Sequence, residues 1–411
     1  MDNLPIAIVE HPMGGIAPDA AAAKADAVIE DIIEKATRWM PRAVASETRP
    51  AFPAPTVSVT DTIEEINDLF YKNAWSDGLP VIPPTEERVE KMLSGTSMKP
   101  DQLIGLIPPR MGAATVQIIA INAVMAGAKS EHLPVIIAAI KAAVHPEAQL
   151  RRWLSTTRPV FLTVFVQGPI VKELGIQYGQ SALFPGPKSN AAIGRAFNLI
   201  TRLLGGATSP PGRVGTMTTL GAPNYSSCLG ENEDALPKGW NPLRVDCGYK
   251  LGDSVVSVFG TTFPLLQNDH DSTDGKGVLM STCYLIGGQL GRAGGADPGG
   301  MVILFGPEHA ATIARDGYSK EDVKRFIFEN AMTPLENLVR GGVWYIVYEH
   351  QPERIKKMVA DKTPMIPEFD RPEQITISVA GGAGKQSIVR IGYENPPPVL
   401  IQGATLTRAG R

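Results

Sequence analysis

The sequence predicts an α/β fold with mixed or mostly parallel sheets flanked by helices. Segments with helical periodicity alternate with short apolar segments along most of the chain. Residues 159–167 are nearly all β-branched or aromatic, which is typical of a central strand covered on both faces. The order strand, Gly-Pro, helix occurs twice, with Gly-Pro at 168–169 and at 306–307, and this repeat predicts two related halves. The alternative is that Gly-Pro is a common way to turn from a strand into a helix.

The chain divides into an N-terminal arm, a linker and a body. In the arm, residues 1–40, an apolar strand over residues 5–10 precedes an Ala-rich helix with apolar positions at helical spacing. A strand and a helix alone do not enclose a core, so we expect the arm to pack on the body or on another subunit. Four prolines make residues 41–58 a semi-rigid linker. The body spans residues 59–411, and its two halves would be residues 59–213 and 214–411.

The elements of the body follow from its periodic segments and its turn residues. Thr62 with Glu65, and Ser319 with Asp322, are helix-capping patterns. Polar residues interrupt the apolar run 115–144, which favours two buried helices over a membrane span. The remaining predicted helices are residues 86–93, 190–204, 275–290, 307–315 and 319–330, and the predicted strands are residues 159–167, 255–260, 301–305, 343–348, 375–380 and 388–391.

The composition is that of an ordinary globular protein. Of the 411 residues, 43% are hydrophobic and 20% are charged. A formal net charge of -3 provides no broad basic surface, so we expect no nucleic-acid partner. Three cysteines, an odd number, do not make a disulfide framework, and the first ten residues contain no positively charged signal region. These features predict a cytoplasmic protein without a membrane segment.

Two polar segments concentrate the reactive side chains. Residues 221–234 combine a thiol, two serine hydroxyls, an amide and three carboxylates in one turn-rich loop. Residues 268–275 form a second polar loop, one apolar strand further along the chain. Because a strand with loops at its ends can bring two such loops together, we expect them to form two walls of one site.

Cys228 and His270 are the predicted catalytic residues of this site. Acidic neighbours raise the pKa of a thiol, so Cys228 needs a histidine, an arginine or a metal to become reactive. Cys228 with His270 matches a nucleophilic Cys/His pair, with Glu231, Glu233 and Asp274 to orient the two groups. Cys228, His270 and Glu231 equally match a site for a divalent metal. Sequence spacing does not choose between these readings, because both depend on proximity in space.

Four residues are predicted to bind the charge of a substrate. Lys188 lies just before the predicted helix 190–204 and Arg195 one turn into it, at a helix N-terminus where anions bind, and Asn224 supplies an amide within the first polar loop. Lys385 follows a Gly-rich stretch that resembles a phosphate-binding loop, although Val379 and Gln386 break that pattern. The alternatives are a capped helix with solvated charges and a plain turn between two strands.

The arm carries a family resemblance. The strand, the motif Val-Glu-His-Pro-Met-Gly-Gly at 9–15 and the Ala/Asp-rich helix resemble the closing segment of the UGSC family. These small α/β proteins are named for a selenocysteine (or cysteine)-Gly-Ser-Cys motif and are distantly similar to selenoprotein B of glycine and betaine reductases. The present chain has no cysteine before Cys228, so the redox motif of the family is absent. The rest of the chain resembles an uncharacterised family associated with UGSC proteins.

The resemblance implies association with a UGSC-type protein. It favours an enzyme subunit that acts on a small anionic molecule by thiol-based redox or group-transfer chemistry. A metal-dependent hydrolase or lyase with the same loops is one alternative. A non-catalytic scaffold that docks the UGSC-type partner through the arm is another, and the arm would also serve a homo-oligomer.

Overall fold

The computed structural model describes residues 6–13, 16–38, 51–59, 62–157, 160–184, 186–206, 225–262, 264–288, 300–340, 351–392 and 395–402. Its contacts divide the chain into two units, Met1–Ala51 and Phe52–Arg411. The predicted strand 343–348 lies outside the described residues.

The first unit contains two helices, α1 (Pro18–Asp26) and α2 (Ile29–Arg38), preceded by an extended segment. The prediction of a strand over residues 5–10 is wrong for the described residues 6–10, because no second strand accepts their backbone hydrogen bonds. The ammonium group of Lys35 donates to the Ile6 carbonyl at 2.8 Å, and that of Lys24 donates to the Pro12 carbonyl at 3.2 Å. The segment is therefore held to the helices by lysine side chains.

The second unit is built on two four-stranded sheets. The first sheet has the order β12-β5-β3-β4, and the second has the order β10-β7-β11-β6. Both contain parallel and antiparallel pairs, which confirms the predicted α/β class with mixed sheets. The strands of the first sheet are β3 (Phe161–Gln167), β4 (Cys228–Gly230), β5 (Val255–Thr261) and β12 (Val399–Leu400), and those of the second are β6 (Leu265–Asn268), β7 (Met301–Phe305), β10 (Ile375–Val379) and β11 (Gln386–Ile391).

The two sheets share one pattern of strand order and direction. In each, a central strand (β3 or β7) pairs parallel to one neighbour (β4 or β10) and antiparallel to the other (β5 or β11). An antiparallel edge strand completes each sheet, but it comes from the other part of the chain. The strand that follows β5 in sequence, β6, pairs with β11, whereas the strand that follows β11, β12, pairs with β5. The chain thus changes sheet between residues 261 and 265, and the sheets exchange their edge strands.

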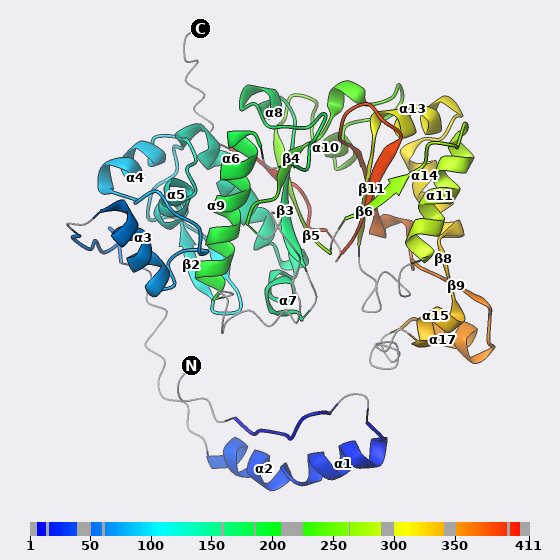
Figure 1. Ribbon diagram of the computed structural model, residues 1–411, viewed down its shortest axis with the longest axis horizontal. Coiled ribbons are helices and arrows are strands. Elements are labelled where there is room, and N and C mark those ends of the chain that lie inside the picture. The colour runs from blue at the N-terminus through cyan, green and yellow to red at the C-terminus, as the bar shows by residue number, and fades with distance from the viewer. Residues whose placement is uncertain are drawn as a thin grey trace. The chain divides into compact units, whose positions relative to one another are not determined.

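The sheets lie between two helical layers (Figure 1). Helices α6 (Leu133–Ala143) and α9 (Lys188–Gly205) pack on the outer face of the first sheet, and α5 (Val116–Met125) packs against these two helices. Helices α11 (Gly275–Gly287), α13 (Pro307–Arg315) and α14 (Lys320–Asn330) cover the outer face of the second. A third core, which includes Phe165, Phe259 and Leu304, lies between the sheets. The result is a four-layer arrangement of helices, sheet, sheet and helices.

Local sequence signals account for most of these helix boundaries. The predicted capping residues Thr62 and Ser319 each accept a hydrogen bond from the backbone N–H three residues later. Nearly every residue of α6 is buried, as its continuous apolar sequence requires. No helix among the described residues combines the length and the apolar character needed to cross a bilayer.

The smaller elements are α3 (Ile63–Lys72), α4 (Glu86–Leu93), α7 (Leu150–Ser155), α8 (Ile170–Glu173), α10 (Leu243–Asp246), α15 (Leu335–Arg340), α17 (Glu353–Ala360), the short helical turns Ser130–His132, Pro146–Ala148, Glu233–Ala235 and Pro372–Gln374, and the strand pairs β1 (Leu103–Ile107) with β2 (Gly112–Thr115) and β8 (Met332–Pro334) with β9 (Met365–Pro367).

Candidate functional site

The first predicted loop is divided by a strand. Residues 228–230 form β4 and pair parallel with β3, so the serines before them and the carboxylates after them lie at opposite ends of that strand. The Ser227 carbonyl accepts from the Val164 amide, and the Glu231 amide donates to the Val166 carbonyl. Asn224 lies outside the described residues.

Cys228 lies within an apolar core. Its side chain is 7% exposed and belongs to the core between the first sheet and its helices. Burial raises the pKa of this thiol far above its ordinary range. The thiolate that redox or nucleophilic chemistry requires is therefore disfavoured at this position.

His270 belongs to the other sheet. It follows β6 and is exposed, and its Nε2 lies 2.9 Å from Asn268 Oδ1. The His270 carbonyl accepts from Lys385 Nζ at 2.9 Å. No hydrogen bond among the described residues joins His270 to Cys228, whose thiol packs in the core on the outer face of the first sheet.

Each of the three carboxylates that were predicted to orient the catalytic pair accepts a hydrogen bond from a backbone amide. Glu231 is 1% exposed and accepts from the Leu243 amide at 2.9 and 3.1 Å and from the Ser378 hydroxyl at 2.6 Å. Burial raises the pKa of Glu231, against the effect of these hydrogen bonds. Because Ser378 lies on β10, Glu231 connects the two sheets at the carboxyl end of β4.

Glu233 and Asp274 have comparable roles in their own segments. Glu233 accepts from the Gly168 amide at 2.8 Å and forms an ion pair with the buried Arg244. Asp274 caps α11 by accepting from the Gly277 amide at 2.8 Å. These contacts account for both carboxylates as structural groups.

Two of the predicted cationic residues, Lys188 and Arg195, lie on α9, whereas Lys385 lies in the turn between β10 and β11. The Arg195 guanidinium forms a two-pronged ion pair with Asp77 at 3.0 and 2.9 Å, and the Asp77 side chain is only 3% exposed. Lys385 donates to the His270 and Ser272 carbonyls and so fastens the Gly-rich turn to the loop after β6. Lys188 is exposed at the first position of α9. Arg195 and Lys385 are thus already engaged with partners from the chain.

The predicted metal ligands do not form a cluster. Cys228 lies in β4 and Glu231 directly after it, whereas His270 follows β6 of the other sheet, and Glu231 is enclosed by its own hydrogen bonds. Within the described part of the chain, no group of three His, Cys, Asp or Glu side chains has a metal-binding arrangement.

Arg390 is the functional candidate that the sequence reading missed. It lies on β11 opposite Val302, on the face that looks toward the first sheet, and its side chain is 1% exposed. Its Nη2 donates to Thr163 Oγ1 at 2.6 Å, and Thr163 Oγ1 lies 2.8 Å from Ser227 Oγ. Its guanidinium carbon lies 4.6 Å from the centroid of the Phe161 ring. The signal in the sequence was a single arginine at an inward position of the apolar strand Ser-Ile-Val-Arg-Ile.

Two of the guanidinium nitrogens of Arg390, Nε and Nη1, are buried and have no hydrogen-bond acceptor among the described residues. No ion pair among the described residues includes this arginine. Burial lowers the pKa of Arg390 to about 9, so the group still carries its charge at neutral pH. The hydroxyl of Thr261, which pairs in register with Phe161, is likewise buried and has no partner within the described part of the chain. Unpartnered polar groups from both sheets thus occur around Phe161.

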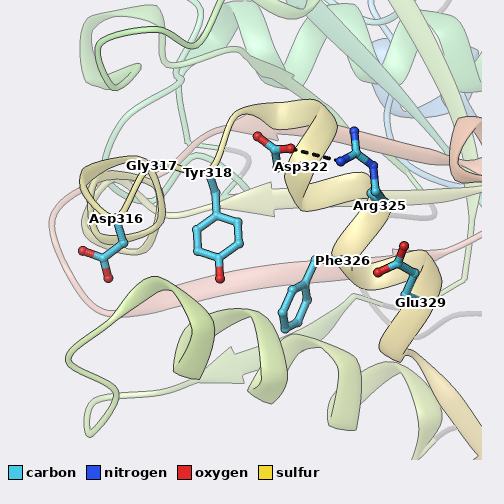
Figure 2. Close-up of a pocket in the computed structure, with 7 residues that line it drawn as sticks. All are labelled: Asp316, Gly317, Tyr318, Asp322, Arg325, Phe326 and Glu329. Carbon is cyan, nitrogen blue, oxygen red and sulfur yellow. Dashed lines mark ion pairs between the residues drawn. The ribbon is translucent and has the colours of Figure 1, made fainter.

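A separate pocket of about 290 Å³ lies at the α13–α14 turn (Figure 2). Its lining combines the Tyr318 and Phe326 rings with Asp316, Asp322, Arg325, Glu329 and Gly317. The Asp322 carboxylate accepts from the amide of Ser319, the N-cap of α14, and pairs with Arg325 at 3.5 Å, and Asp316 accepts from the Gly275 amide. Two of the three carboxylates of the pocket therefore accept hydrogen bonds from backbone amides. None of the predicted site residues lines this pocket.

Comparison with models of protein families, with curated proteins and with solved structures finds no match to the chain. The functional argument therefore depends on the chemistry of the described residues. Among them, Arg390 is a strongly buried charge for which no described side chain supplies a counter-charge.

Proposed function

We propose that the protein binds a small anionic molecule between its two sheets, with Arg390 as the group that holds the charge. The observation that carries this proposal is a buried guanidinium whose Nε and Nη1 have no acceptor among the residues that the structure describes. Arginine is the side chain best suited to hold carboxylate and phosphate groups, because its planar donors match their oxygens.

The free-energy cost of burying the charge of Arg390 supports the binding of an anion beside it. Transferring an unpaired charge from water into a protein interior costs several kcal/mol, even after the surroundings relax. The Phe161 ring and the Thr163 hydroxyl offset part of this cost, each by about 1 to 2 kcal/mol. An anion at Nε or Nη1 would supply the charge compensation that the chain does not.

The neighbouring groups define the class of ligand. Thr163 accepts from Arg390, so its own hydrogen is available for Ser227 Oγ, which lies 2.8 Å away. The Thr261 hydroxyl provides a further donor and acceptor. Ser227 is half-buried, so this chain of hydroxyls leads from the surface toward the guanidinium. A small carboxylate or phosphate compound with polar substituents fits these contacts.

Thiol chemistry is not part of this proposal. Cys228 packs in an apolar core on the outer face of the first sheet, whereas Arg390 faces the space between the sheets. Substitution of Cys228 or His270 by alanine is therefore expected to leave anion binding unchanged. The association with a UGSC-type protein remains a proposal that rests on the resemblance of the arm.

Thermal unfolding in the presence of acetate, succinate or inorganic phosphate tests the proposal. A ligand present at about 100 times its Kd stabilises the native state by about 2.7 kcal/mol, so at least one of these anions should raise the Tm of the wild type. Arg390→Met keeps the length of the side chain and removes the charge, and it should abolish the response. Arg325→Met is the matched control, because Arg325 is an exposed arginine on α14. Equal responses in the wild type and Arg390→Met would rule the site out.

A further inference from the structure

The pocket at the α13–α14 turn combines two aromatic rings with carboxylates. The rings of Tyr318 and Phe326 both line it, with 6.1 Å between their centroids and 88° between their planes. In the view of Figure 2 the rings lie between Asp316 on one side and Glu329 on the other. The pocket volume of about 290 Å³ is at the lower end of the range for ligand pockets, so we expect a small ligand.

Helical spacing places one ring and two carboxylates of this pocket on the same side of α14. Asp322, Phe326 and Glu329 follow one another at intervals of four and three residues. Val323 and Ile327, on a neighbouring side of the helix, are buried in the core of the second sheet. The core therefore fixes the direction in which the pocket side of α14 faces.

The second ring is positioned by its backbone. The Tyr318 carbonyl accepts from Trp240 Nε1 at 2.9 Å, and the Tyr318 amide donates to the Ile313 carbonyl at 3.3 Å. Gly317, directly before it, has a φ of +90°, a conformation that favours glycine. The aromatic walls of the pocket are thus in place before a ligand binds, which reduces the entropic cost of binding.

The lining of the pocket has an excess of negative charge. It contains three carboxylates and one guanidinium. Arg315 pairs with Asp316 at 2.8 Å, and Arg325 pairs with Asp322 at 3.5 Å. Within the described part of the chain, the third carboxylate, that of Glu329, has no ion pair and no hydrogen bond. A ligand with a positive charge would therefore find an uncompensated carboxylate beside the two rings.

Aromatic faces and carboxylates attract the same class of ligand. The face of an aromatic ring is electronegative and binds cations, above all ammonium groups that carry alkyl substituents. Neither Tyr318 nor Phe326 has a cation over its ring among the described residues. A metal ion would instead need several converging ligands, and the described residues contain no such group.

We propose that this pocket binds a small organic ammonium ion, with Tyr318 and Phe326 as its walls and Glu329 as its counter-charge. The proposal is independent of the anion site, because Arg390 lies on β11 and is not part of the pocket. Arg390→Met should therefore leave ammonium binding unchanged.

An NMR titration of the full-length protein with tetramethylammonium chloride, observed through the ligand methyl signal, tests the proposal. Sodium chloride keeps the ionic strength constant, and 2-methyl-2-propanol is a neutral control of similar size and shape. We expect saturable binding of tetramethylammonium and at least about tenfold weaker binding of the alcohol. The absence of saturable binding, or equal binding of the alcohol, would overturn the proposal.

Substitutions on α14 locate the binding. Phe326→Leu should weaken tetramethylammonium binding about fivefold, and Glu329→Gln should weaken it about threefold. Phe328→Leu and Glu321→Gln are the matched controls, because both residues lie on α14 outside the pocket lining, and they should bind as the wild type does. Glu329 is exposed, so its substitution removes the charge without disturbing the core. Equal affinities of the pocket variants and their controls would reject this site.

Discussion

The two sheets have the same strand order and the same strand directions, yet they contribute different chemistry to the space between them. The first sheet presents hydroxyls there, from Thr163 and Thr261, whereas the second presents the guanidinium of Arg390. A duplicated topology thus encloses one candidate site, whose charge comes from one sheet and whose hydroxyls come from the other. The comparison indicates that the shared strand order provides only the framework. The few side chains that face the space between the sheets determine which ligand can bind there.

The Gly-Pro turns that follow the two central strands, β3 and β7, also differ from each other. Gly168 has a φ of +96°, and Pro169 precedes the four-residue helix α8. Gly306 has a φ of -66°, and Pro307 is the first residue of the nine-residue helix α13. The shared Gly-Pro sequence therefore corresponds to two backbone conformations. The matching strand order supports two related halves better than the dipeptide does.

The largest expected effect concerns the bond that joins the two sheets at the carboxyl end of β4. Glu231→Ala removes a buried carboxylate and leaves the Leu243 amide and the Ser378 hydroxyl without their partner. We expect the free energy of unfolding to fall by about 3 kcal/mol, as measured by urea denaturation. Asp271→Ala, at an exposed position, is the control. A loss no greater than that of the control would mean that the sheets do not depend on this connection.

The next effect concerns a buried histidine in the helical layer of the first sheet. His132 accepts from the Lys129 amide, and its Nε2 lies 3.2 Å from Ser189 Oγ. Burial lowers the pKa of His132 from 6.5 to about 4. The unfolded state therefore binds this proton first, and stability that is complete above pH 6.5 is lost as the pH falls toward 4. Between pH 7 and pH 4 the loss should be about 2 to 3 kcal/mol.

Denaturation of His132→Gln across this pH range measures that contribution. The variant should have a flatter pH dependence than the wild type, whereas His270→Gln, at an exposed position on the second sheet, should not. Identical pH profiles for all three proteins would remove His132 as the cause.

The smallest expected effect concerns the hydrogen bond between Arg390 and Thr163, which joins the two sheets. Thr163→Val deprives Arg390 Nη2 of its acceptor, so it should destabilise the wild type by about 1 to 3 kcal/mol. In an Arg390→Met background the same substitution should be nearly neutral, because the charge is gone. A double-mutant cycle by urea denaturation should therefore give a coupling energy of about 1.5 kcal/mol. If the two substitutions had additive effects on the free energy of unfolding, the hydrogen bond between Thr163 and Arg390 would not contribute to stability.

Much of the fold could be predicted from local sequence signals. Helix α4 begins and ends where its pattern predicts, at Glu86 and Leu93, and the central strands β3 and β7 lie in the predicted apolar segments. These elements are specified by burial on both faces or by a capping residue, which are properties of contiguous residues. The three-residue strand β4 was missed, because its neighbours Ser227 and Glu231 read as one polar loop. Only pairing with β3 makes that segment a strand.

The candidate site was less predictable, because its residues are far apart in the sequence. Arg390 and Thr163 are 227 positions apart, and no local pattern links them. The sequence reading favoured Cys228 because its neighbours are polar, yet neighbours along a strand point to opposite faces. The direction of each side chain depends on strand register, which is set by tertiary packing.

The exchange of edge strands has a consequence for the order in which the molecule forms. During synthesis, β3, β4 and β5 emerge early, but their sheet stays incomplete until residues 399–400 have left the ribosome. The second sheet, in turn, takes its edge strand β6 from the segment made directly after β5. Neither half is therefore a closed folding unit, and a nascent chain stopped between β5 and β12 would present the unpaired edge of β5 to a chaperone or a neighbouring chain.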